Sequence, residues 1–111
     1  MSDTAPEIRA ALVWCPFPDR DTAARIAKSL LDEGHIACAN IVPEVHSLFM
    51  WKGELDEGKE AVALLKTNSA RLDGAIARLA ALHPYEEPAI VGWCCDAAAP
   101  ATAAWLEGLG R

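Results

Sequence analysis

Short apolar runs separated by polar turns divide the chain, and their lengths predict strands more readily than helices. Four strands are predicted in this order: Ile8–Cys15, Ile36–Trp51, Ala61–Leu65 and Ala89–Cys95. Pro16 follows the first run and is expected to end it. Pro43 interrupts the second run, which resumes at Val45. We interpret this stretch as one long strand bent at Pro43, because proline is tolerated at a bulge or on an edge strand.

Between the first two strands, apolar residues recur at helical spacing, at Ala23, Ile26, Ala27, Leu30 and Leu31. Asp19 is expected to cap the start of this helix, and Asp21 places negative charge in its first turn. Gly34 is expected to end the helix in the left-handed conformation.

Two further helices follow the third and fourth strands. The apolar stripe of the second consists of Leu72, Ile76, Leu79 and either Leu82 or His83. Asn68 or Ser69 is its predicted cap, and Pro84 stops it. Pro100 suits the first turn of a short final helix. That helix is expected to bury Trp105 and Leu109.

The elements therefore run β-α-β, a hairpin, β-α-β and a terminal helix. The polar, glycine-containing segment Lys52–Lys59 is expected to be the hairpin loop. Right-handed crossovers place both long helices on one face of a four-stranded antiparallel sheet, with strands one and three at its centre. This is an α+β, ferredoxin-like split β-α-β fold. We expect one domain over residues 1–111, with residues 1–6 as a loose N-terminal tail. So widespread a fold does not settle function.

Composition narrows the class of partner. The chain is 52% hydrophobic, although much of this is alanine, and its formal net charge is -6. A small domain cannot hide so much apolar surface alone, which favours oligomerisation. No cationic stretch is present to neutralise phosphates, so neither nucleic acid nor an anionic membrane is an expected partner. A metal ion or another cationic ligand is compatible with the sign of the charge.

Targeting and redox features favour the cytoplasm. The first six residues lack the basic start and apolar core of a signal peptide, and no apolar run has the roughly 20 residues of a membrane helix. The four cysteines lie inside apolar runs rather than on loops, at Cys15, Cys38, Cys94 and Cys95. That arrangement is untypical of a secreted disulfide framework, so we expect reduced thiols.

The segment His83-Pro84-Tyr85-Glu86-Glu87-Pro88 carries the most unusual chemistry. It places an imidazole, a phenol and two carboxylates between prolines that restrict the backbone. One interpretation is a rigid binding loop, and the other is a helix stop with a packed tyrosine. His35 beside Gly34 is expected to contact the end of the first helix, and His46 is expected on the surface.

The cysteines are either small buried hydrophobes or ligands. Cys94 and Cys95 point to opposite faces of their strand. Cys15 and Cys38 belong to strands that need not be adjacent within a subunit. No CxxC spacing indicates structural zinc. Enzyme motifs are also missing, including GxSxG, HExxH, P-loop and GxGxxG patterns. The chain is therefore not expected to be an enzyme.

Four segments in order resemble the CutA divalent-cation tolerance family. They are Ala37–Pro43, Ser47 with the Trp51-Lys52-Gly53 turn, Glu60–Thr67 and His83–Pro88, followed by Trp105-Leu106. The similarity spans about residues 8–109. It implies a ferredoxin-like subunit in a tight homotrimer, whose long second strand reaches into a neighbour. It also implies a response to divalent metals, copper above all.

Matched residue by residue, the resemblance implies copper ligands at Cys15, Cys38, Glu60 and His83. Thiolates favour Cu(I), and imidazole suits copper in either oxidation state. Copper is not expected to be required for folding. The alternative is a trimeric signalling or scaffold protein, similar in plan to PII proteins. Its small-molecule clefts would lie between subunits and be lined by Trp51, Lys66 and Tyr85.

Overall fold

The computed structural model describes residues 7–110. The predicted tail at residues 1–6 lies outside them. Seven elements follow one another along the chain: β1 (Ala10–Phe17), α1 (Arg20–Asp32), β2 (Cys38–Trp51), β3 (Glu54–Asn68), α2 (Leu72–Leu82), β4 (Val91–Cys94) and α3 (Pro100–Glu107). The expected α+β class and the expected order of elements are confirmed.

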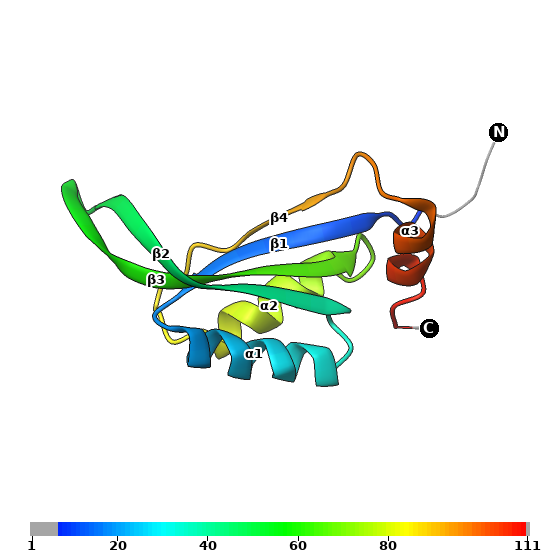
Figure 1. Cartoon of the computed structure of the whole chain (residues 1–111), viewed down its shortest axis with the longest axis horizontal. Coiled ribbons are helices and arrows are strands. Elements are labelled where there is room, and N and C mark those ends of the chain that lie inside the picture. Colours follow the sequence, from blue (N-terminus) through cyan, green and yellow to red (C-terminus); the bar gives the residue numbers. More distant parts are fainter. Residues whose placement is uncertain (1–6, 111) are drawn as a thin grey trace.

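The four strands form one sheet in the order β2-β3-β1-β4, and every neighbouring pair is antiparallel. Figure 1 shows α1 and α2 together on one face of this sheet, with α3 at one end. The main core lies between that face and the two helices. It includes Val13, Cys15 and Phe17 of β1, which are buried against Ile26 and Leu30 of α1.

Within residues 7–110, the opposite face carries no helix (Figure 1), and we call it the open face. Because side chains alternate along a strand, Leu12 and Trp14 of β1 belong to it, between the buried positions of that strand. Register adds Leu64 and Lys66 of β3 and Val91 and Trp93 of β4. In the described part of the chain, helices therefore cover one side of the sheet and leave the other uncovered.

The first helix begins and ends as predicted. The Thr22 N–H donates a 2.7 Å hydrogen bond to Asp19 Oδ1, which caps the helix. Gly34 has a φ of 76°, the left-handed conformation in which glycine carries no steric penalty. Local sequence signals were sufficient at both ends.

The first strand continues through Pro16 to Phe17, so its predicted end at Cys15 is wrong. β4 pairs only with Ala11–Trp14, so at Pro16 the strand has β3 as its one partner. Proline is tolerated there because it lacks only one ladder hydrogen bond.

β2 is one strand with a register shift between Val42 and Val45, which confirms the bulge predicted at Pro43. The hairpin loop predicted over 52–59 is wrong, because residues 54–59 belong to β3. The turn is only Lys52-Gly53, with φ values of 51° and 82°. Positive φ at both positions is what a two-residue hairpin turn of this twist requires.

Among residues 7–110, Val45–Trp51 and Glu54–Glu60 pair only with each other, beyond the point where β1 ends. We call this two-stranded extension the ribbon. It projects from the sheet in Figure 1, and the molecule measures 52 Å along its longest axis. Its polar residues face solvent on both sides, so the apolar alternation that marks a strand is absent from this half of β3.

The second helix begins at Leu72, and its N-cap is Arg71 rather than the predicted Asn68 or Ser69. Asn68 lies in the preceding turn, where its side chain accepts a 3.0 Å hydrogen bond from the Arg71 N–H. The expected burial of Trp105 by the third helix is wrong: Trp105 is 52% exposed, and Leu106 is the buried residue. α3 packs against the end of the sheet, so its contact face is centred one position later than expected. Leu109 is partly buried.

β4 is shorter than predicted and covers Val91–Cys94. Gly92 lies on its helix-facing side, where an added Cβ would come within 2.9 Å of Leu72 Cδ1. That close approach requires glycine. Among residues 7–110, no helix has the length and apolar character needed to cross a membrane.

Candidate functional site

Cys15 and His83 meet at one backbone oxygen. Cys15 is fully buried on the helix-covered face of β1, and its thiol donates to the Pro16 carbonyl at 3.4 Å. His83, directly after α2, is 7% exposed, and its Nε2 lies 2.8 Å from the same oxygen. The structure therefore brings together two predicted ligands that sequence reasoning could not place against each other.

The His83 ring is held by two aromatic contacts and by hydrogen bonds at both of its nitrogens. It stacks on Phe17 with ring centroids 4.8 Å apart and an interplanar angle of 20°, and Tyr85 packs against it at a tilt. The Tyr85 N–H donates to Nδ1 at 3.1 Å. Because Nδ1 accepts this hydrogen bond, the neutral ring carries its proton on Nε2 and donates it to the Pro16 carbonyl.

Glu60 completes this neighbourhood from β3. The Tyr85 hydroxyl donates a 2.8 Å hydrogen bond to Glu60 Oε2. Burial, together with this hydrogen bond and the Glu60 charge, raises the pKa of Tyr85. Burial first, and the Glu60 charge second, raise the pKa of Cys15 to about 12. The thiol is therefore protonated at neutral pH.

Cys38 lies elsewhere. It opposes Lys66 of β3, which opposes Leu12 of β1, so all three share the open face. Cys15 opposes Ala63, three positions along β3 and on the other side of the sheet, about 10 Å away along the strand. The Cys38 thiol is partly buried, 3.7 Å from Asn40 Oδ1. One subunit does not bring Cys38 to the other three predicted ligands.

The donor chemistry at Pro16 suits copper, since a thiol and an imidazole converge there. The arrangement is not a formed metal site. Within residues 7–110, no three His, Cys, Asp or Glu side chains are grouped closely enough to hold a metal ion. Both ring nitrogens of His83 are also in hydrogen bonds. Binding therefore requires local rearrangement.

The three residues predicted to line a cleft are far apart in one subunit. Trp51 lies at the tip of the ribbon, with Lys52 Nζ 5.9 Å from its ring centroid. Lys66 is partly buried on the open face, about 40 Å along β3 from the tip. Tyr85 lies beyond the end of β1. Any cleft that unites them needs more than one subunit.

The open face and the ribbon expose many large apolar side chains. All four tryptophans are between 41% and 52% exposed. The exposed apolar residues of these two surfaces are Trp14, Val42, Val91 and Trp93 on the open face and Leu48, Phe49, Met50, Trp51 and Leu55 on the ribbon. A patch of this kind is a signature of an interaction surface.

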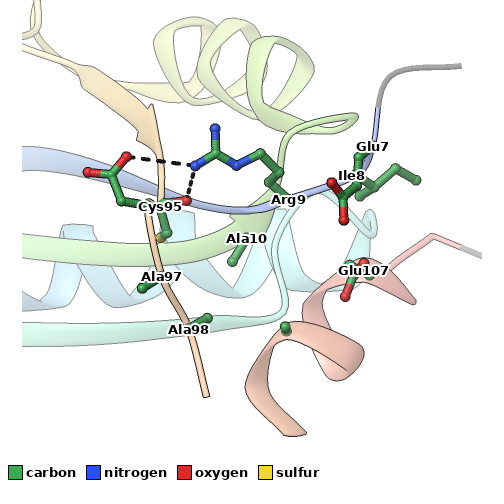
Figure 2. Close-up of a pocket in the computed structure, with 10 residues that line it drawn as sticks. Glu7, Ile8, Arg9, Ala10, Cys95, Ala97, Ala98 and Glu107 are labelled. Atoms are coloured by element: carbon green, nitrogen blue, oxygen red, sulfur yellow. Dashed lines mark hydrogen bonds and ion pairs between the residues drawn. The ribbon is translucent and has the colours of Figure 1, made fainter. Parts of the chain in front are cut away.

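Two hollows in the surface lie away from the predicted ligands. One has a volume of about 260 Å³ and is lined by residues that include Glu7 and Glu107. In it, the Arg9 guanidinium approaches the Cys95 carbonyl and the Asp96 carboxylate (Figure 2). The other, of about 410 Å³, lies on the ribbon around His46 and Glu57. His46 is exposed, as predicted. Neither hollow contains Cys15, His83 or Tyr85.

Sequence reasoning missed Pro16 and Phe17 as parts of the site. Phe17 provides the surface on which His83 stacks, and Pro16 provides the shared carbonyl. Their position directly after Cys15 is the available signal, but a proline at that position predicts only the end of a strand. The alternative that all four cysteines are buried holds for Cys15 alone, since the other three are partly exposed.

Comparison with known proteins identifies the family. The family model described as CutA1 divalent ion tolerance protein matches residues 11–108. The divalent-cation tolerance protein CutA of Pyrococcus horikoshii is 40% identical over 80 residues, 72% of this chain and 78% of that protein. The CutA of Thermus thermophilus is 42% identical over the same length and the same shares.

Solved structures agree. The divalent ion tolerance protein CutA1 of Ehrlichia chaffeensis superposes with a TM-score of 0.84 at 30% identity, covering 91% of this chain and 94% of that one. The periplasmic CutA of Archaeoglobus fulgidus has a TM-score of 0.83 at 26% identity, with shares of 88% and 95%. Because the sequence comparisons and the structural comparisons agree, this chain belongs to the CutA1 divalent ion tolerance protein family.

Proposed function

We propose that this protein acts in divalent-cation tolerance by binding copper at Cys15 and His83. The convergence of the Cys15 thiol and the His83 imidazole on the Pro16 carbonyl carries the proposal. The names of its relatives support the physiological role. Thiolate and imidazole together suit Cu(I). We propose copper as a ligand rather than a requirement for folding, because the core is built from apolar side chains.

Glu60, which accepts a hydrogen bond from the Tyr85 hydroxyl in the same neighbourhood, would become a third donor only after the local rearrangement described above. Cys38 was implied as a ligand by family resemblance. Its place on the open face means that it would serve a separate site or act on a neighbouring subunit. A Cys38→Ala variant distinguishes these roles. If Cys38 is a ligand of the Cys15 site, its removal weakens copper binding at that site, and otherwise that binding is unchanged.

Competition against a chromophoric Cu(I) chelator, under reducing conditions, tests the proposal. Cys15→Ala and His83→Gln are expected to weaken binding by about tenfold or more. Cys94→Ala and His46→Ala are matched controls, since each removes the same kind of group elsewhere, and they should bind as the wild type does. Equal affinity in all five proteins would overturn the assignment.

We further propose a ferredoxin-like subunit that assembles as a homotrimer. The support is the apolar open face and ribbon, which a lone subunit leaves in contact with water. Light scattering coupled to gel filtration measures the mass directly. A mass of three chains is expected, and a single chain of 11.9 kDa at micromolar concentration contradicts the proposal.

The second candidate function is a PII-like signalling or scaffold role, with a small molecule in clefts between subunits. Lys66 favours it: this side chain is partly buried on an apolar face and forms no ion pair within the described residues. A ligand selective for the native state raises the melting temperature. Stabilisation by an anionic metabolite and not by copper, lost in Lys66→Met, would favour this role.

We propose no catalytic activity, because the Cys15 thiol is protonated and His83 has no free nitrogen to act as a base. The relatives are named as tolerance proteins. Free thiols and the net charge of -6 support a cytoplasmic protein that binds neither nucleic acid nor membranes. The Archaeoglobus relative is periplasmic, so fractionation of cells is the test of location.

A further inference from the structure

Lys66 is the one cationic side chain among the strand residues of the open face, in the described part of the chain. Strand register places it in a row that crosses the whole sheet, from Cys38 of β2 through Lys66 and Leu12 to Trp93 of β4. Its side chain is partly buried and belongs to no ion pair among residues 7–110. The nearest carboxylate on this face of β3 is Glu60, six positions away, or about 20 Å along the strand.

Assembly makes an unpaired ammonium unfavourable at this position. The open face, which also carries Trp14, Val91 and Trp93, is the apolar surface that the proposed homotrimer covers. A charge that leaves water for an apolar contact needs a partner of opposite charge. Because no carboxylate of its own subunit pairs with Lys66, the surface that covers the open face has to supply one.

The ribbon has such a surface, because the bulge in β2 reverses the alternation of its side chains. Between Val42 and Val45, β2 uses one residue more than β3 does. Beyond the bulge, Phe49 and Trp51 therefore point to the same side of the sheet as the open face. We call this the open side of the ribbon. Both rings are exposed, at 42% and 47%.

Two carboxylates share the open side of the ribbon with these rings. Asp56 is the cross-strand partner of Phe49, and Glu54 is the partner of Trp51. Both carboxylates are exposed, and neither belongs to an ion pair within residues 7–110. Glu57, on the other side of the ribbon, is instead paired with a histidine at 2.9 Å. The open side therefore combines apolar rings with acidic groups that have no cationic partner in the described chain.

We propose that the open side of one subunit's ribbon docks on the open face of a second copy, where Glu54 and Asp56 form ion pairs with Lys66 of that copy. The inference rests on the homotrimer proposed above and names the residues that join its subunits. Charge and apolar character both match, since Phe49 and Trp51 leave water as Lys66 gains its acceptors. The ribbon and the open face are different surfaces, so the contact is heterologous, and a closed ring satisfies every copy of each.

Zero-length cross-linking with a carbodiimide, which joins a carboxylate to an amine in contact, tests this docking directly. Glu54 and Lys66 lie twelve positions apart on one extended strand, about 40 Å, so a single chain cannot join them. We expect peptide mass spectrometry to find links from Lys66 to Glu54 or Asp56. Links from Lys66 to Glu57 alone, or no link to any ribbon carboxylate in a trimeric protein, would overturn the docking.

Charge reversal measures how much these ion pairs contribute to assembly. Lys66→Glu, and the double variant Glu54→Lys with Asp56→Lys, should each raise the concentration at which subunits dissociate by at least about tenfold. Combining all three substitutions restores opposite charges and should recover most of that loss, which separates lost pairing from lost folding. Lys59→Glu and Glu57→Lys are matched controls on the other side of the ribbon and should dissociate as the wild type does.

The two proposals fail in different ways. A wild-type protein that is a single chain at micromolar concentration removes the homotrimer and the docking together. A trimer that lacks these links, or whose dissociation the charge-reversal variants leave unchanged, overturns the docking and leaves the homotrimer standing. Links at Glu54 or Asp56, together with recovery in the combined variant, support both.

Discussion

Cys15 and Cys38 lie on opposite faces of the same sheet. Cys15 opposes Ala63 and points into the core, whereas Cys38 opposes Lys66 and shares the open face with Leu12. No rotation of either side chain can place both sulfurs on one metal within a subunit, because the sheet itself lies between them. Cys15 is instead the neighbour of His83.

The environment of Cys15 predicts slow alkylation. Burial and the Glu60 charge raise its pKa from 9.0 to about 12, which lowers the reactive thiolate fraction near pH 8 by about 1,000-fold. When the native protein is treated with iodoacetamide, Cys15 should remain unmodified, whereas all four cysteines should be alkylated in the unfolded protein. Peptide mass spectrometry measures the extent of alkylation at each cysteine. Labelling of Cys15 at the rate seen in denaturant would contradict its burial.

The same pKa predicts a loss of stability in alkali. The folded thiol holds its proton up to about pH 12, whereas the unfolded thiol releases it near pH 9.0. The contribution of this thiol to the free energy of unfolding is therefore fully present below pH 9.0. It decreases as pH rises toward 12, by up to about 1.4 kcal/mol per pH unit. Tyr85, whose pKa is also raised, acts in the same direction.

Cys15→Val is the control for this pH dependence, since it fills a similar volume and does not titrate. Urea unfolding at several pH values should give a shallower decline for the variant than for the wild type. Parallel declines would assign the effect to other groups.

Asn68 is predicted to be a major contributor to stability. Its side chain is 1% exposed and donates to the carbonyls of Leu106 and Leu109 while accepting from the Arg71 N–H. It therefore joins the start of α2 to the end of α3. Asn68→Ala should cost about 2–4 kcal/mol in urea unfolding, because buried polar groups lose their partners.

Substitution of the neighbouring Ser69 gives a reference for the free-energy cost of Asn68→Ala. Ser69 accepts a single 2.8 Å bond from the Arg9 N–H in a partly exposed setting. Ser69→Ala should cost only about 1 kcal/mol. An Asn68→Ala effect no larger than this would show that the bridge between the two helices adds little.

The ribbon turn gives two substitutions of opposite sign. Lys52 has a φ of 51°, which is unfavourable for lysine but tolerated by asparagine, so Lys52→Asn should stabilise by about 0.5–1 kcal/mol. Gly53 has a φ of 82°, so Gly53→Ala should destabilise by about 1 kcal/mol. Thermal unfolding of both variants checks the turn, and equal effects would mean that its backbone differs from the one described.

Local signals in the sequence were enough for much of the fold. Asp19 and Gly34 define the first helix through hydrogen-bond chemistry and backbone conformation, which act over a few residues. Pro43 marked the bulge for the same reason. The ribbon was missed because its β3 half is polar on both sides, so the apolar alternation that identifies a strand never appears there.

The candidate site depends on longer-range order. Which face Cys38 occupies is set by strand register, and a shift of one residue would reverse it. The contact of His83 with the Pro16 carbonyl joins positions 67 residues apart. The family resemblance implies that Cys38 and His83 are both ligands. Only the structure shows that His83 lies beside Cys15 and that Cys38 does not.

Anomalous diffraction from crystals of the protein grown with Cu(I) tests the copper site most directly. The account predicts a metal peak within bonding distance of Cys15 Sγ and one nitrogen of His83 in the same subunit. A peak at Cys38 alone, with the Cys15 and His83 contacts unchanged, or no peak on the protein at all, would contradict it.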